Sequence, residues 1–82
     1  MPRPPKKPII ERKLGRHQSL GLCYEDGTVE IDERLEGQER LEVYVHELIH
    51  RHQPYLDEEE VDRLGKAIGA DLWASGWRQV RG

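Results

Sequence analysis

The chain has 82 residues, of which 35% are charged and 35% are hydrophobic, and this length allows only one small domain with a modest core. The single cysteine excludes an internal disulfide and a multi-cysteine zinc site. There is no signal-peptide pattern and no apolar run long enough to cross a membrane. We therefore expect a soluble, cytoplasmic protein with no membrane partner.

The net charge of −3 at pH 7 is distributed unevenly along the chain. Residues 1–8 are basic and rich in proline, which predicts a disordered or extended tail, and residues 9–82 form the single expected domain. Residues 19–60 hold thirteen acidic residues and three arginines. This acidic stretch argues against a nucleic-acid-binding domain, so only the basic tail is suited to touch a nucleic acid or an acidic partner.

The first expected elements are short strands. Residues 8–16 have the character of a strand that enters the domain. Residues 19–24 and 28–32 flank an Asp26-Gly27 dipeptide, a pattern that predicts a β-hairpin. The alternating apolar positions are Leu20, Leu22 and Tyr24 in the first arm and Val29 and Ile31 in the second. We predict a small antiparallel sheet of two or three strands.

A helix is predicted from residue 38 to about residue 52, since this stretch contains neither Gly nor Pro. Pro54 favours an end of the helix just before it. The apolar positions at helical spacing are Leu41, Tyr44, Val45, Leu48 and Ile49. We expect this stripe to pack into the core while an adjacent side of the helix presents polar residues to a cleft.

That helix contains an H-E-x-x-H motif, His46-Glu47-Leu48-Ile49-His50. Residues four apart lie on the same face of a helix, so His46 and His50 can offer two imidazole nitrogens to one metal ion. Glu47 lies beside them, where it can take a proton from a metal-bound water. These are two of the three protein ligands and the general base of a zinc hydrolase.

A second helix is predicted over residues 57–75, with Asp57 as its N-cap and Glu60 at the N3 position of a capping box. Its expected apolar face consists of Val61, Leu64, Ala67, Ile68 and Leu72. Glu58 lies near the edge of this face, from which its side chain can point back to the first helix as a third metal ligand. Asp62 can then accept the second ring N–H of a ligating histidine. Glu59 and Glu60 are the alternative third ligands.

Residues 46–62 resemble the zincin metallopeptidases, and among them the gluzincins, in which the H-E-x-x-H helix is followed by a glutamate in an E-x-x-x-D context. Glu58 and Asp62 match that context here, although the gap after His50 is shorter than gluzincins usually have. The resemblance covers roughly residues 28–78. It implies zinc (Zn2+) held by His46, His50 and Glu58, Glu47 as the general base, and a peptide or protein substrate.

We thus expect an α+β fold, a reduced zincin-like domain in which a hairpin sheet packs on two helices. The expected function is a zinc-dependent metallopeptidase or amide hydrolase. Two alternatives stay open, a non-catalytic module with a structural zinc and a small interaction protein without metal. Because the chain is short, a partner protein or an oligomer is a further way to complete a substrate cleft.

His17 and His52 are expected on the surface. Tyr55 is expected to pack or to donate a hydrogen bond to an oxyanion.

Overall fold

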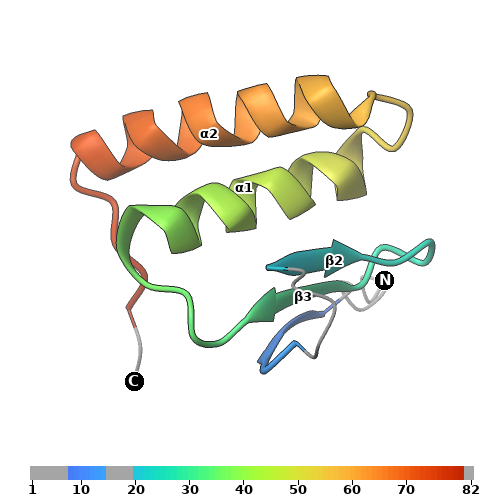
Figure 1. Cartoon of the computed structure of the whole chain (residues 1–82), viewed down its shortest axis with the longest axis horizontal. Helices are drawn as coiled ribbons and strands as arrows, with labels where there is room; N and C mark the ends of the chain where they lie inside the picture. The colour runs from blue at the N-terminus through green and yellow to red at the C-terminus, as the bar shows by residue number, and fades with distance from the viewer. Residues whose placement is uncertain (1–7, 15–19, 81–82) are drawn as a thin grey trace, which may run out of the picture.

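The computed structural model describes residues 8–14 and 20–80 and has the expected α+β fold, a three-stranded sheet with two helices (Figure 1). The elements are β1 (Ile9–Arg12), β2 (Gly21–Cys23), β3 (Val29–Asp32), α1 (Gly37–His52) and α2 (Glu58–Ala74). Helix α1 lies between the sheet and α2, and among the described elements α2 packs on α1 alone. None of these helices is both long enough and apolar enough to span a bilayer. Most of the predicted tail, residues 1–7, and His17 lie outside the described residues.

The hairpin is confirmed, but the sheet is mixed rather than antiparallel. Strands β2 and β3 pair antiparallel, with Leu22 opposite Glu30. Strand β1 pairs with β3 in parallel, with Ile9 opposite Val29. In the strand order β1-β3-β2 the central strand is β3, and β1 lies on the side of β3 opposite to β2. The parallel pair therefore joins strands that are not consecutive along the chain, and the pattern of neighbouring residues that predicts a hairpin does not predict such a pair.

The turn of the hairpin forms as its sequence predicts. Gly27 adopts a φ of 92°, a left-handed conformation that glycine accepts without steric cost. The carboxylate of Asp26 accepts a hydrogen bond of 2.9 Å from the backbone N–H of Thr28. The backbone N–H of Tyr24 donates to the carbonyl of Thr28, and that of Gly27 donates to the carbonyl of Tyr24, and these two bonds close the loop.

The apolar alternation of β2 points away from the core. Leu20, Leu22 and Tyr24 are each at least 37% exposed, whereas Val29 and Ile31 are fully buried. Residues that stand opposite one another in a sheet share a face, and the partners of Val29 and Ile31 are Cys23 and Gly21. The face of β2 that meets α1 is therefore built from its small residues.

The apolar core is small and lies between the sheet and the helices. Its fully buried or nearly buried members are Leu14, Val29, Ile31, Leu35 and Val61. Val43 and Tyr44 of α1 pack against the group formed by Val29, Ile31 and Leu35. A core of this size leaves little free energy in reserve, so the polar contacts around it matter for the fold.

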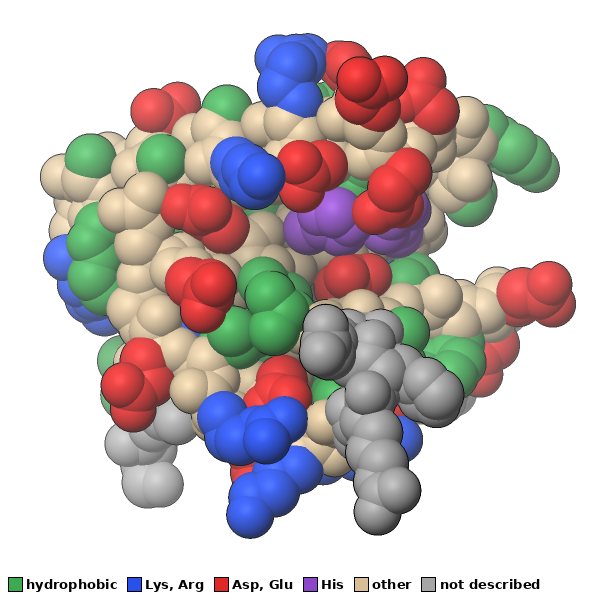
Figure 2. All heavy atoms as spheres, viewed as in Figure 1, with side chains coloured by type: hydrophobic (Ala, Val, Ile, Leu, Met, Phe, Trp, Pro, Cys, Tyr) green, Lys and Arg blue, Asp and Glu red, His purple; other side chains and the backbone are tan. Residues whose placement is uncertain are grey.

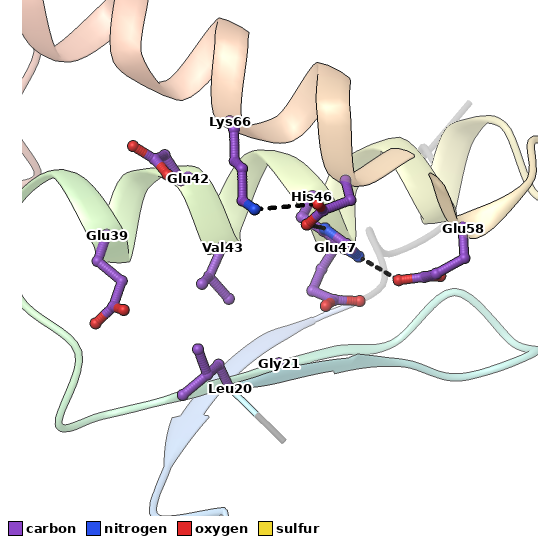
Figure 3. A pocket seen from close by; sticks show the side chains of 10 residues that line it. Leu20, Gly21, Glu39, Glu42, Val43, His46, Glu47, Glu58 and Lys66 are labelled. Carbon is purple, nitrogen blue, oxygen red and sulfur yellow. Dashed lines mark hydrogen bonds and ion pairs between the residues drawn. The ribbon is translucent and has the colours of Figure 1, made fainter. Parts of the chain in front are cut away.

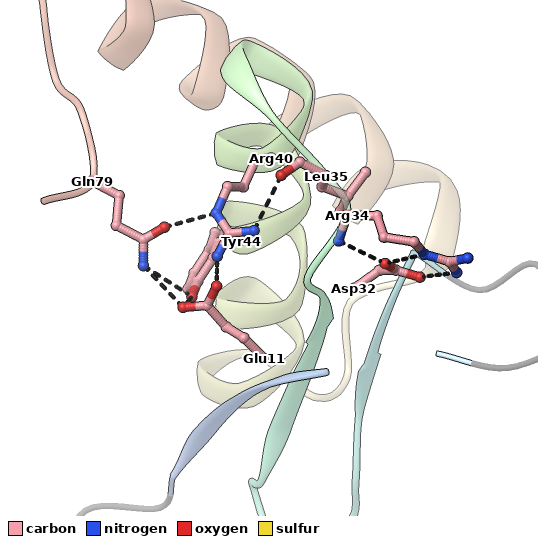
Figure 4. Close-up of polar contacts among 7 residues, drawn as sticks. All are labelled: Glu11, Asp32, Arg34, Leu35, Arg40, Tyr44 and Gln79. Atoms are coloured by element: carbon pink, nitrogen blue, oxygen red, sulfur yellow. Dashed lines mark hydrogen bonds and ion pairs between the residues drawn. The ribbon is translucent and has the colours of Figure 1, made fainter. Parts of the chain in front are cut away.

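The opposite face of β3 is held by ion pairs. Glu30 accepts hydrogen bonds from Arg12 and Tyr24, and these bonds lower the pKa of its carboxyl group. Asp32 accepts bonds from the side chain and backbone of Arg34, which hold the pKa of Asp32 well below its usual range (Figure 4). Both residues are more than nine-tenths buried, and their hydrogen-bond partners satisfy the carboxylates on the face of the sheet that points away from α1.

The most buried positions of α1 are polar, contrary to the predicted apolar stripe. They are Arg40 and Glu47, which lie seven residues apart on the face toward the sheet. Arg40 pairs with Glu11 of β1 and donates to Gln79, 2.7 Å away, and to the carbonyl of Leu35 (Figure 4). This cluster ties β1 and the C-terminal segment to α1.

Helix α2 starts with the predicted cap. The Asp57 carboxylate accepts a hydrogen bond of 2.8 Å from the backbone N–H of Glu60. The Glu60 side chain does not complete a capping box, because it pairs with Arg63 instead.

The buried face of α2 differs from the predicted one. Val61, Gly65 and Gly69 are buried, while Ile68 is 40% exposed and Ala67 is also exposed. A Cβ added at Gly69 would lie 2.7 Å from the Cα of Glu42, and one at Gly65 would lie 3.1 Å from the Cα of His46. The two glycines allow the helix backbones to approach closely, so α2 is rotated to present them rather than its larger side chains.

We predict that Gly69→Ala destabilises the protein although alanine is the better helix former. The helix propensity gain is about 1 kcal/mol. The clash with the Glu42 backbone forces the helices apart, and overpacking of this kind costs about 1–3 kcal/mol. The net loss should lower the melting temperature by several degrees. The control is Asp71→Ala on the exposed side of α2, which should melt at or above the parent temperature. A Gly69→Ala variant more stable than the parent would contradict the close helix contact.

Candidate metal centre

The predicted site residues come from two helices joined by a tight turn. His46, Glu47 and His50 lie on α1, and Glu58 is the first residue of α2. Residues 53–57 reverse the chain direction, helped by a backbone hydrogen bond of 3.2 Å from Leu56 to Gln53. The first turn of α2 is thereby brought over the last turns of α1 (Figure 1).

Two imidazoles and one carboxylate converge in this corner. The Nε2 atom of His46 lies 2.9 Å from Oε1 of Glu58, and Nε2 of His50 lies 2.8 Å from Oε2 of the same carboxylate. The ring centroids of the two histidines are 5.0 Å apart. One potential ligand atom from each of the three residues falls within 4.8 Å of the others. Figure 2 shows the histidines in a hollow of the surface with acidic side chains around it.

The contact between α1 and α2 sets this arrangement. Gly65 lies directly against the backbone of His46, so α2 passes close enough for Glu58 to reach both rings. Asp62, one turn after Glu58, lies 3.9 Å from Nδ1 of His46, which is beyond a direct hydrogen bond. Asp62 pairs with Lys66 at 3.1 Å instead.

Glu47 is buried beside the histidines without a hydrogen-bond partner among the described residues. It is 7% exposed, and its side chain points from α1 toward Gly21 at the edge of the sheet (Figure 3). Burial raises the pKa of the Glu47 carboxyl group, an effect that the nearby histidines oppose. Its side chain lines two open hollows of the surface, and a carboxylate that faces such a hollow without a hydrogen bond from a described residue is characteristic of sites that bind or react.

Two hollows open on either side of Glu47, with volumes of about 320 and 470 Å³. They share the lining residues Gly21, His46, Glu47 and Glu58. We call the two together the site groove, because it runs along β2 with these four residues at its middle. The Glu58 side chain is 71% exposed, so the cluster is open to solvent.

The other predicted candidates do not join the cluster. Glu59 is exposed, and Glu60 pairs with Arg63, so Glu58 is the only one of the three consecutive glutamates that contacts the histidines. His52 is exposed, as expected of a surface histidine. Tyr55 is 99% exposed, so the expectation that it packs is wrong, and it does not line the site groove.

Gly21 is a site residue that the sequence interpretation missed. A Cβ at this position would lie 2.8 Å from Cγ and 2.9 Å from Oε2 of Glu47. The signal was available, because a glycine inside a strand pattern often marks a close approach of another group. Without this glycine, β2 and the Glu47 carboxylate cannot occupy their present positions.

Arg51 and Cys23 were also missed. Arg51 donates to the carbonyl of Gly27, 2.8 Å away, and to that of Pro8, so it fixes the hairpin tip against the end of α1. Cys23 packs against the core and lines one end of the site groove. Burial and the nearby Glu47 raise the pKa of its thiol, which keeps the thiol protonated.

Comparison with known protein families, with curated proteins and with solved structures gives no match for this chain. The chemistry of the site therefore has to be inferred from its own residues.

We predict that Glu47→Gln stabilises the metal-free protein. The substitution keeps the shape of the side chain and removes an unpartnered buried charge, so the gain should be on the order of 1 kcal/mol. The measurement is thermal unfolding at neutral pH with a chelator present. Glu39→Gln, an equal change of charge at an exposed position of the same helix, should leave the melting temperature almost unchanged. A clear loss of stability in Glu47→Gln would show that the carboxylate has a structural partner.

Proposed function

We propose that this chain is a zinc-dependent metallopeptidase or amide hydrolase. His46, His50 and Glu58 would hold the metal, and Glu47 would act as the general base. The observation that carries the proposal is the convergence of two imidazole nitrogens and a carboxylate next to the largely buried Glu47 side chain, which lines an open groove.

The donor set suits zinc. Two imidazole nitrogens and one carboxylate are the ligands of one of the common catalytic zinc sites, in which the fourth position stays open. Zinc bonds to such ligands measure about 2.0–2.2 Å, so tetrahedral ligand atoms stand roughly 3.3–3.6 Å apart. The histidine nitrogens lie 2.9 and 2.8 Å from the Glu58 oxygens, and one ligand atom from each residue lies within 4.8 Å of the others, so side-chain rotations would bring the three to these separations.

Zinc in this position would supply a Lewis acid that polarises a substrate carbonyl and acidifies a water molecule. The protein residues would do the rest. Glu47, at the floor of the groove, would accept a proton from the attacking water and deliver it to the nitrogen of the leaving amine.

The free edge of β2 supports a peptide or protein as the substrate. One side of β2 pairs with β3, and no other strand within residues 8–14 and 20–80 pairs with its far side. The site groove follows this edge past Glu47. An extended peptide could add to the sheet there and bring one of its carbonyls to the metal centre.

A non-catalytic module with a structural zinc is the alternative. Structural zinc sites are closed by four protein ligands. Among the described residues the cluster contains three, and its carboxylate is 71% exposed. This openness favours the catalytic function.

We keep a cytoplasmic location as part of the proposal. The chain has one cysteine and therefore no internal disulfide, the bond that forms in oxidising compartments outside the cytoplasm.

We predict that the purified protein binds one zinc ion and that His46→Ala, His50→Ala and Glu58→Gln each reduce its zinc content. Bound zinc stabilises the folded state, by about 2.7 kcal/mol when free zinc is 100 times the dissociation constant. Mass spectrometry of the native protein and melting curves with and without chelator measure both effects. His52→Ala and Glu59→Gln are the matched controls and should bind zinc like the parent. Equal zinc binding by Glu58→Gln and Glu59→Gln would remove Glu58 from the ligand set.

We also predict that Glu47→Gln retains zinc but loses hydrolysis of peptides by a factor of at least about 100, because general-base catalysis typically contributes that much. The assay follows a mixture of quenched fluorescent peptides with the zinc-loaded protein. Zinc binding without any hydrolysis by the parent would favour the structural alternative. Undiminished hydrolysis by Glu47→Gln would reject Glu47 as the base.

A further inference from the structure

The two halves of the site groove differ in charge. The half toward the start of α1 is lined by the shared residues and by Leu20, Glu39, Glu42, Val43, Asp62 and Lys66. The half toward the end of α1 carries Arg51 and Glu25 together with apolar and uncharged residues. Acidic side chains therefore predominate on one side of Glu47, whereas the charges on the other side balance. We call the first half the acidic half.

Glu39 and Glu42 belong to the same stripe of α1 as the histidines. They precede His46 by seven and four residues, which places all three on one side of the helix. The Glu39 side chain points down from α1 toward the region of Leu20 (Figure 3). The Glu42 side chain lies against Gly69, and one of its oxygens accepts a hydrogen bond of 2.8 Å from Gln38.

The negative charge of the acidic half is not neutralised within the described part of the chain. Its one basic side chain, Lys66, pairs with Asp62 at 3.1 Å. The Glu39 carboxylate forms no ion pair with any described residue, and Glu42 is bonded only by a neutral amide. Carboxylates that line a groove concentrate a negative potential in it and attract cationic groups.

A second observation at the same place points to a ligand. Glu47, which is 7% exposed and accepts no hydrogen bond from any residue that the structure describes, lines this half of the groove as well as the other. The acidic half also has an apolar floor, made by Leu20 and Val43. Lysine and arginine combine an apolar stem with a cationic head, so they match an apolar floor with an acidic rim.

We propose, on the basis of the peptidase function above, that the preferred substrates carry Lys or Arg on one side of the cleaved bond. The basic side chain would lie in the acidic half, with its head group at Glu39 and with Glu42 as a second, weaker contact. Seven residues of helix span about 10 Å, and an extended peptide advances about 3.3 Å per residue. The basic residue therefore stands about two to four residues from the cleaved bond.

The test uses the zinc-loaded full chain and pairs of quenched fluorescent peptides. Each pair differs only by Lys or Gln at one position, scanned over four positions on each side of the cleaved bond. The expected result is a kcat/KM about three to ten times higher for Lys, at positions on one side only, as for a partly exposed ion pair. The preference should shrink as the salt concentration rises.

Two variants locate the preference. Glu39→Gln should abolish most of it, so that the Lys and Gln peptides of a pair are cleaved with similar kcat/KM. Glu33→Gln, which makes the same change of charge outside the groove, should keep the preference of the parent. Equal kcat/KM for Lys and Gln peptides, or a preference that survives in Glu39→Gln, would overturn the inference and leave the peptidase function intact.

Failure of the function itself gives a different pattern. If the zinc-loaded protein cleaves none of the peptides, the same pairs with a fluorescent label are titrated against it and binding is followed by anisotropy. Tighter binding of Lys peptides that depends on Glu39 would retain the acidic half as a recognition site, and the hydrolase proposal alone would fall. Equal binding of both peptides would overturn the inference as well.

Discussion

The contact between Gly65 and the backbone of His46 sets the position of the candidate metal centre. Helix α2 packs on α1 and on no described strand, so this helix pair alone determines where Glu58 stands. Gly65 and Gly69, one turn apart, let the two backbones approach until the start of α2 covers both histidines. A Cβ at either position would press on the backbone of α1, so the two glycines allow the first turn of α2 to lie over the rings.

The two most buried polar residues of α1 illustrate two uses of a polar group in a small core. Arg40 is surrounded by partners from β1, the C-terminal segment and the turn before α1, so its burial serves to join these parts. Glu47 is equally buried on the same face and has no such partners among the described residues. Its side chain instead lines both halves of the site groove, where the proposed function would use it.

The groove joins the proposed chemistry to the proposed recognition. Glu47 and the histidines stand at its middle, the free edge of β2 forms one wall, and α1 forms the other. Gly21 makes this geometry possible, because it lets the strand edge come within contact distance of the Glu47 side chain. Because the two halves of the groove differ in charge, a substrate with basic residues at one end would bind in one orientation.

Local patterns in the sequence were sufficient for the elements and for the list of candidate residues. The Asp26-Gly27 turn, the Asp57 cap and the helix from residue 37 to 52 depend on nearest neighbours, which the sequence displays directly. The spacing of His46 and His50 likewise places them on one face of any helix. Local patterns did not reveal the parallel pairing of β1, the outward direction of Leu22 or the burial of Arg40.

Those features depend on which surfaces meet in space. The face of the sheet that packs on α1 carries the small residues Gly21 and Cys23, because they fit beneath the helix. The larger apolar residues of the same segment alternate on the opposite face. The choice of Glu58 over its two neighbours likewise followed from the rotation of α2 about its glycines. The sequence by itself thus determined which groups could act together. Only the packing of α2 on α1 and of α1 on the sheet decided which of them lie together, because close contact between backbones depends on residues that are distant along the chain.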